Sequence, residues 1–209
     1  MKTKLKHILV ILCLSMISCE GNLEPELFDQ ITPENFLTNE DDVKTAVTGV
    51  YAELRGISEW GRYKTSWGSV MTLQEVPTDL WAANWFYKAH TDFMWKATDY
   101  FVCEIFEFFV PAITKATALI ARIQDAPVSD DIKNRYIAEL RVVRALWMYD
   151  LFDLYGPVPA ITDPEKILNP TQHFTVTRPS REEYITFVET ELKEVIIVYV
   201  FLECDIYTY

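Results

Sequence analysis

The chain has 209 residues, of which 50% are hydrophobic and 14% aromatic, and its formal net charge is −12. This length and apolar content suit one domain with a sizeable core, or part of a larger domain, and the aromatic fraction argues against a disordered chain. Nucleic acids and anionic lipid surfaces are polyanions, so the acidic balance leads us to expect no nucleic-acid partner.

Residues 1–18 have the pattern of a bacterial secretory signal. Three lysines precede an apolar run at residues 8–17, which is too short to span a bilayer comfortably. The run ends in Met16-Ile17-Ser18-Cys19, which resembles the lipobox of bacterial lipoproteins, where the cysteine is lipidated and becomes the new N-terminus. We therefore predict lipidation of Cys19, the alternative being an ordinary signal peptide with an incidental cysteine.

Residues 19–32 contain acids and no base, and we expect them to form a solvated acidic tether. Acids that closely follow a lipidated cysteine resemble the surface-export signal of Bacteroidetes lipoproteins. The predicted location is therefore the outer membrane, with a lipid anchor and a surface-exposed chain. The acids are Glu20, Glu24, Glu26 and Asp29.

A first helix is predicted to start near residue 40 and to end at Gly56. Thr38 or Asn39 can cap it, and three acids follow at the positive end of its dipole. A short helix is expected at residues 66–75 and should stop before Pro77. The apolar residues that recur at helical spacing in the first helix are Val43, Val47, Val50 and Leu54.

Residues 77–98 show neither helical nor strand periodicity and are rich in aromatic side chains. A long aromatic loop of this kind is uncommon unless it is functional. Trp81 and Trp85 would present one aromatic face if the stretch makes a helical turn. The alternative is that both tryptophans fill a gap between helices. The candidate ligand-binding residues are Asp79, Trp81, Asn84, Trp85 and Tyr87.

Two long helices are expected to form an antiparallel hairpin. The first spans about residues 99–124 and contains Pro111, which should kink it or split it. The second is capped by Ser129 and runs to Tyr155. Gly156 is expected just past the helix end, in a left-handed conformation.

The second helix of this hairpin carries apolar side chains on two faces. Trp147 and Leu151 belong to one face and Met148 to the other, so we expect the helix to be packed on two sides. Arg141 and Arg144 lie within these faces. We expect their stems to cover apolar surface and their guanidinium groups to pair with carboxylates.

The last helix opens with a capping box formed by Ser180 and Glu183. Its helical spacing dissolves after Glu194, so residues 197–209 are expected to form an atypical tail. No strand pattern is convincing before residue 196. The sequence therefore predicts an all-α fold, with one helical domain over residues 33–196.

Motifs for metal binding or catalysis are absent from the sequence. The three histidines, His7, His90 and His173, are far apart, and there is no His-Glu-x-x-His, Cys-x-x-Cys or phosphate-binding glycine loop. We expect no metal site, no cofactor and no catalytic residue. Cys103 is expected to be a packed thiol. A disulfide between Cys103 and Cys204 is the alternative in an oxidising compartment.

Residues 138–162, AELRVVRALWMYDLFDLYGPVPAIT, resemble a segment of the SusD/RagB family of lipoproteins in which an acid, two arginines, Ala-Leu, aromatics and a Gly-x-Val-Pro turn recur. Residues 33–56 resemble the first helix of that family, and residues 178–196 resemble its helix after the proline turn. Thr117, where the family commonly has Asn, and Pro111 depart from the pattern. The matching positions are Glu139, Arg141, Arg144, Ala145, Leu146, Tyr149, Asp150, Leu151, Tyr155, Gly156, Val158 and Pro159.

The resemblance implies a superhelix of tetratricopeptide-like helix pairs. Because family members are much longer, we expect this chain to be truncated and its fold incomplete at the C-terminus. The resemblance also implies a non-enzymatic lipoprotein that captures glycans, or sometimes peptides, and delivers them to a SusC-like TonB-dependent transporter in the outer membrane. The alternative is a helical-repeat scaffold lipoprotein that binds other proteins and has no small ligand.

Overall fold

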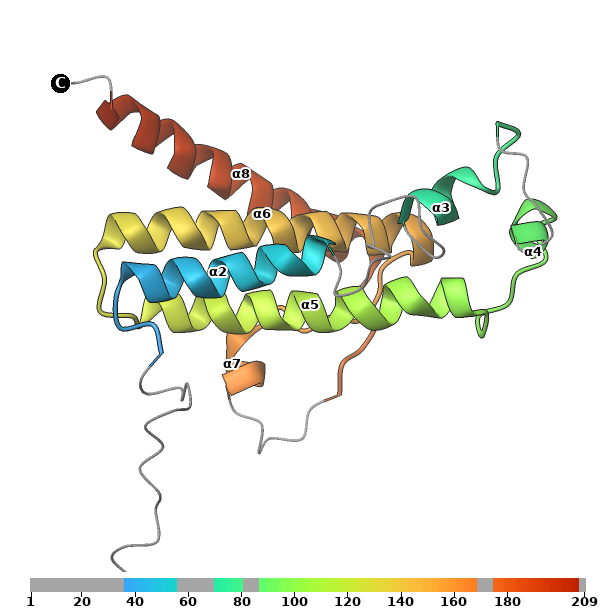
Figure 1. Ribbon diagram of the computed structural model, residues 1–209, viewed down its shortest axis with the longest axis horizontal. Coiled ribbons are helices and arrows are strands. Elements are labelled where there is room, and N and C mark those ends of the chain that lie inside the picture. The colour runs from blue at the N-terminus through green and yellow to red at the C-terminus, as the bar shows by residue number, and fades with distance from the viewer. Residues whose placement is uncertain (1–35, 56–69, 81–86, 169–174, 207–209) are drawn as a thin grey trace, which may run out of the picture. The chain divides into compact units, whose positions relative to one another are not determined.

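The computed structural model describes residues 36–55, 70–80, 87–168 and 175–206. The chain divides into two compact units, Met1–Phe36 and Leu37–Tyr209. The signal, Cys19 and the acidic tether lie outside the described residues. The second unit, whose helices are labelled in Figure 1, carries the features described below.

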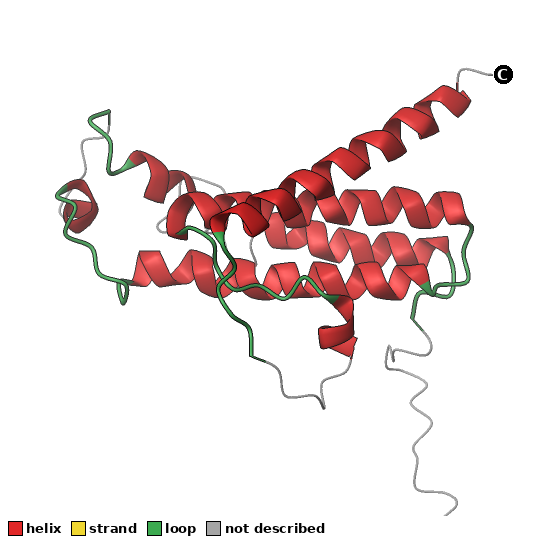
Figure 2. Cartoon of the chain, turned by 180° about the vertical axis from the view of Figure 1, so that it is seen from behind, coloured by secondary structure: helices red, strands yellow, loops and turns green. Residues whose placement is uncertain are grey.

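The second unit is built from helices. In the part of the chain that the structure describes, every regular element is a helix (Figure 2), so the prediction of an all-α fold is confirmed. In chain order the helices are α2 (Glu40–Arg55), α3 (Val70–Glu75), α4 (Lys88–Thr91), α5 (Tyr100–Gln124), α6 (Asp130–Tyr155), α7 (Pro164–Leu168) and α8 (Arg181–Ile206).

Helix α6 is packed on two sides, as its two apolar faces predict. It forms the expected antiparallel hairpin with α5, and α2 packs against both helices. The ring of Phe109 on α5 lies 6.3 Å from the ring of Trp147 on α6, between centroids, and both side chains are fully buried. On its other side α6 contacts α8, where the Tyr184 hydroxyl donates to the Met148 carbonyl at 3.0 Å.

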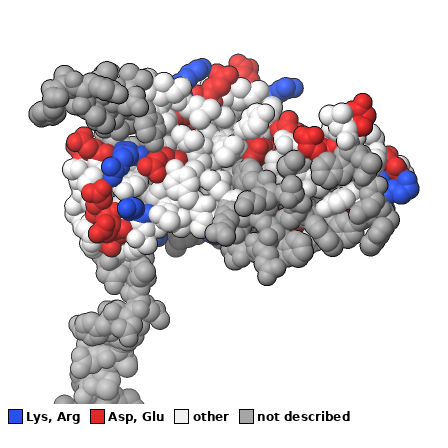
Figure 3. Space-filling model, turned by 45° about the horizontal axis from the view of Figure 1, so that its top comes forward, with Lys and Arg blue, Asp and Glu red and all other residues white. Residues whose placement is uncertain are grey.

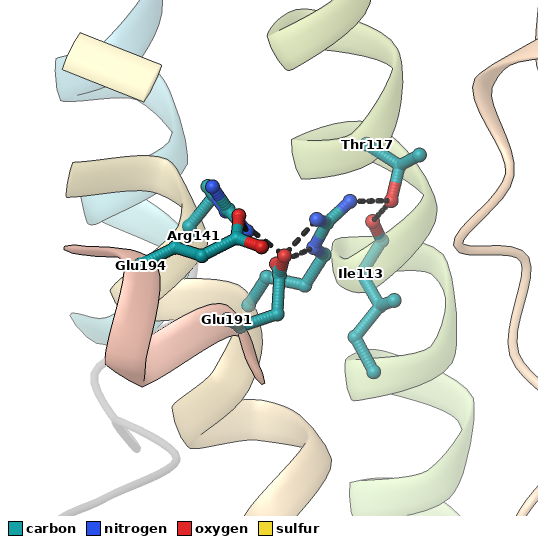
Figure 4. Close-up of polar contacts among 6 residues, drawn as sticks. Ile113, Thr117, Arg141, Glu191 and Glu194 are labelled. Carbon is teal, nitrogen blue, oxygen red and sulfur yellow. Dashed lines mark hydrogen bonds and ion pairs between the residues drawn. The ribbon is translucent and has the colours of Figure 1, made fainter. Parts of the chain in front are cut away.

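A partly buried set of charges, which we call the Arg–Glu network, joins α6 to α8 (Figure 4). It consists of Arg141, Arg144, Glu191 and Glu194. Glu191 accepts hydrogen bonds from Arg141 Nε at 2.9 Å and from Arg144 Nε at 2.8 Å, and it forms a further ion pair with Arg144 Nη2. Arg141 also pairs with Glu194. The expected pairing of both arginines with carboxylates is therefore confirmed.

The network extends to α5 through a hydroxyl. Arg144 Nη1 donates to Thr117 Oγ1 at 2.9 Å, and that hydroxyl donates in turn to the Ile113 carbonyl at 2.9 Å. The Arg144 guanidinium also lies 5.4 Å from the centre of the Phe187 ring on α8. Thr117, one of the two departures from the family pattern, thus places a buried acceptor where the guanidinium needs one.

Helix α5 continues through Pro111, so of the two predicted outcomes, a kink or a split, the split does not occur. Proline removes one backbone donor and costs a helix about 3 kcal/mol. Phe109, Ala112 and Ile113 are all buried beside it. Burying each large side chain contributes about 1.5–3 kcal/mol, so packing outweighs the local penalty.

The helix starts depend on local side-chain caps. Asn39 Oδ1 accepts from the Asp42 backbone N–H at 3.0 Å and caps α2 as expected. Ser180 and Glu183 form the predicted capping box. The Ser180 backbone N–H donates to Glu183 Oε2 at 2.7 Å, and the Glu183 backbone N–H donates to Ser180 Oγ at 3.1 Å. Ser129 occupies the cap position of α6 but makes no side-chain cap bond, so that part of the prediction is wrong.

Gly156 ends α6 with a backbone that glycine accommodates and other residues do not. Its φ is 73° and its ψ is −162°, and its N–H donates to the Phe152 carbonyl at 2.9 Å. The positive φ confirms the expected stop. The ψ value differs from the left-handed helical conformation that we expected, and it belongs to a region populated almost only by glycine.

Helix α8 runs to Ile206, so the expected loss of helix after Glu194 is wrong. β-Branched and aromatic residues are only modest helix breakers. Extending an existing helix requires no new nucleus, and α8 is already nucleated and docked on α6. Residues 197–206 of the run that we interpreted as an atypical tail therefore continue the helix.

Candidate functional site

A groove of about 340 Å³ lies between α3, the α4–α5 connection, the start of α5 and the end of α6. Its volume is at the small end of the range for ligand pockets. We call it the aromatic groove. Its aromatic walls are His90, Trp95 and Tyr155, and Leu73, Val102 and Leu154 provide aliphatic wall.

Trp95 is held by neighbouring rings. The His90 imidazole is stacked on it with an interplanar angle of 15° and a centroid separation of 6.0 Å, and the Phe93 ring lies 5.5 Å away in a tilted arrangement. His90 is only 5% exposed. Burial lowers the pKa of His90, and the nearby Asp99 carboxylate opposes this shift. The wall is therefore neutral at neutral pH, because a lowered pKa keeps the imidazole uncharged.

The connection that carries Trp95 exposes apolar side chains beside the groove. Phe93 is 66% exposed, Met94 71% and Trp95 41%. Phe93 also has a φ of 56°, which is uncommon for a bulky residue and often marks a functional site. Contiguous exposed apolar side chains, in a conformation that costs free energy, indicate a binding surface.

Hydrogen bonds order this connection and its surroundings. The Tyr155 hydroxyl on α6 donates to the Val102 carbonyl on α5 at 2.7 Å, and Asp99 Oδ2 accepts from the Lys96 N–H at 2.8 Å within the connection. The Cys103 thiol donates to the Ala97 carbonyl at 3.1 Å. Cys103 is thus a half-buried free thiol, in agreement with the prediction that it packs as a thiol. The groove is consequently built on the α5–α6 hairpin.

Of the residues that we predicted from the aromatic loop, none that the structure describes lines the groove. Asp79 is exposed in the turn after α3, and Tyr87 is half-buried directly before α4, where burial raises its pKa. Trp81, Asn84 and Trp85 lie outside the described residues.

The sequence prediction did not single out the three rings that line the groove. Trp95 had an available signal, since it closes the run Phe93-Met94-Trp95 within the unusual aromatic loop. His90 and Tyr155 had none, because a histidine in a loop and a tyrosine at a helix end are both common core residues. Their role depends on contacts between distant parts of the chain.

Other site chemistries find no support in the described residues. No three His, Cys, Asp or Glu side chains among them are grouped in a way that would hold a metal ion. None of the described helices is both long enough and apolar enough to cross a membrane.

The helical architecture matches that of a solved SusD-like protein from Bacteroides fragilis, with a TM-score of 0.60. The fold is SusD-like. The two chains are 22% identical, and the match covers 82% of this chain and 32% of the other, so this chain spans about a third of that protein's length. No family model and no curated protein matches the sequence. The fold that the sequence resemblance implied is therefore confirmed by structure.

Proposed function

We propose that this SusD-like chain is a lipoprotein of the outer-membrane surface that captures glycans and delivers them to a SusC-like TonB-dependent transporter. It binds its ligand without transforming it and needs no cofactor. On this proposal Cys19 carries the lipid anchor, and the acidic tether that follows it separates the anchor from the helical unit.

The aromatic groove is the observation that carries this proposal. Pyranose rings have apolar faces that stack on flat aromatic side chains, and Trp95 offers such a surface beside an apolar groove. The exposed Phe93 extends the same surface. A rigid support matters for stacking, and the connection is attached to α5 by the hydrogen bond from the Cys103 thiol to the Ala97 carbonyl.

Retention of polysaccharides in affinity electrophoresis tests the proposal. A panel of polysaccharides should contain at least one that retards the full chain. Trp95→Ala should abolish that retardation, whereas Tyr149→Ala, which removes an exposed aromatic side chain from the middle of α6, should not. Trp81→Ala and Trp85→Ala then ask whether the predicted loop residues share the ligand. If the polysaccharide retards the Trp95→Ala and Tyr149→Ala variants equally, the aromatic groove is not the glycan-binding site.

A protein-binding scaffold is the second candidate function, and one surface favours it. The outer face of α6 exposes Val142, Leu146 and Tyr149, spaced so that they form one apolar stripe. A scaffold would lose its partner when this stripe is made polar, with Leu146→Glu as the sharpest change. A glycan-capture protein would keep its polysaccharide in the same variant, so the two functions separate in one experiment.

A further inference from the structure

The charges around the aromatic groove suggest which sugar it prefers. Among the described residues that line it, none is acidic or is a lysine or arginine. Any preference for charge must therefore come from the three rings of the wall and from charged groups just outside it. His90 is neutral at neutral pH for the reason given above, so the wall itself places no positive charge against a ligand.

Two carboxylates lie near residues that line the groove. Asp153 directly precedes the lining residue Leu154 in the sequence, and Gln74 directly follows the lining residue Leu73. Asp153 Oδ2 accepts a hydrogen bond from Gln74 Nε2 at 2.9 Å. Asp99 lies close enough to His90 to influence it electrostatically. On the face shown in Figure 3, carboxylates lie at both ends of the helical unit, including the end that carries α3 and α4.

Among the described residues near the groove, Lys88 is paired with Asp92 at 2.6 Å, and Lys96 is exposed. The C-terminal end of α6 and the N-terminal end of α5 both lie at the groove. The two ends carry opposite partial charges that offset each other, so the charge preference depends on the side chains.

Aromatic faces and surrounding negative charge together favour a cation. A cationic group over the face of an indole or phenol ring is attracted by the ring quadrupole, and nearby carboxylates strengthen that attraction. A carboxylate at the same position is repelled both by the ring face and by the nearby carboxylates. A sugar that stacks on Trp95 and carries an amine on its ring satisfies the apolar surface and the charge together.

We propose that the aromatic groove selects a hexosamine unit with a free amine over neutral sugars and over uronic acids. This inference rests on the proposed glycan-binding function and names the chemical class of the sugar bound at the same groove.

Three methyl glycosides that differ in one group test the inference: a glucosaminide, a glucoside and a glucuronide. Ligand-observed NMR titrations of the full chain at about pH 6.5 keep the amine protonated, since amines of this type lose their proton above about 7.5. The glucosaminide should bind about two- to fivefold more tightly than the glucoside, as expected for a cation over an aromatic face. The glucuronide should bind more weakly than both.

Two variants connect the preference to the groove. Asp153→Asn keeps an oxygen acceptor for Gln74 but removes the charge, so it should reduce the preference for the amine. Asp131→Asn, at the opposite end of α6 and also exposed, is the matched control and should leave the preference unchanged. Trp95→Ala should weaken binding of all three glycosides.

Equal affinities, a preference for the glucuronide, or no measurable binding of any glycoside at tens of millimolar would overturn the inference. Retardation by a polysaccharide that depends on Trp95, combined with equal affinities for the three glycosides, would refute the charge preference alone. If no polysaccharide is retarded in a Trp95-dependent way and the three glycosides also show no difference in affinity, the glycan-binding function is refuted as well.

Discussion

Glu191 is the residue on which the docking of α8 should depend most strongly. Its side chain is only 5% exposed, and it is the shared acceptor for Arg141 and Arg144. Glu191→Ala leaves Arg141 with Glu194 as a partner. Arg144, whose side chain is 7% exposed, would keep only the neutral Thr117 hydroxyl.

Breaking a buried ion pair by removing one partner costs about 3–5 kcal/mol, because the remaining charge stays buried without compensation. Burial already lowers the pKa of Arg144, and the Glu191 carboxylate opposes that shift. We therefore expect Glu191→Ala to lower the free energy of unfolding by about 3–5 kcal/mol. For a chain of this size the melting temperature should fall by about 6–20 °C.

Glu194→Ala is the matched control, since it removes the same type of residue from the same helix. The Glu194 side chain is 52% exposed, and an exposed ion pair contributes about 0–1 kcal/mol. Circular dichroism at the helical signal, followed through heating and through urea denaturation, measures both variants. An equal cost for Glu191→Ala and Glu194→Ala would refute the reasoning, because it would show that burial adds nothing to this network.

A double replacement separates the charge from the packing. Arg144→Met with Glu191→Leu fills the same space with apolar side chains and removes both charges. Replacing a buried ion pair in this way is often neutral or stabilising. The double variant should therefore be more stable than Glu191→Ala. A double variant as unstable as Glu191→Ala would show that the network contributes favourable free energy of its own.

Two further predictions follow from single positions. Gly156→Ala should destabilise the chain by about 1–3 kcal/mol, since a Cβ at this glycine would touch nothing within 4 Å and the cost comes from the backbone conformation alone. Gly49→Ala in α2 should instead stabilise the chain by up to about 1 kcal/mol, because a Cβ there also has no neighbour within 4 Å and alanine favours a helix. If the melting temperatures of both variants move in the same direction, the comparison is contradicted. Metabolic labelling with a tagged fatty acid should mark the wild-type protein and miss Cys19→Ala, and equal labelling of both would remove the proposed anchor.

Two of the three predicted helix caps are found, because they are local. Asn39 bonds to a residue three positions later, and so does Ser180, so spacing alone identifies both. Ser129 makes no side-chain cap bond. The same reasoning correctly located the stop at Gly156. Helix α5 is not split at Pro111 and α8 does not end after Glu194, because tertiary packing and an established helix outweigh weak local preferences.

The partners across the core could not be predicted. Arg144 and Glu191 are 47 residues apart in sequence, and periodicity shows only that an arginine lies on an apolar face. The sequence therefore predicted that the arginines would find carboxylates but could not identify them. The aromatic groove has the same origin, because Trp95 and Tyr155 meet only when the α5–α6 hairpin has formed. Spacing rules describe one helix at a time and contain no information about which helix lies opposite.

Helix α6 contributes to two separate features along its length. Arg144 holds α8 near the middle of the helix, and Tyr155 forms part of the groove wall at its end. Eleven residues of helix separate them, or about 16 Å at 1.5 Å per residue. Substitutions that far apart, with no shared partner, act independently. Glu191→Ala should therefore lower the melting temperature yet retain the polysaccharide below that temperature, whereas Trp95→Ala should lose the polysaccharide with little change in the unfolding of α8. If Glu191→Ala released the ligand while the chain was still folded, the groove and the Arg–Glu network would be parts of one cooperative unit. The conclusion that α5 and α6 form a rigid support for the groove would then be wrong.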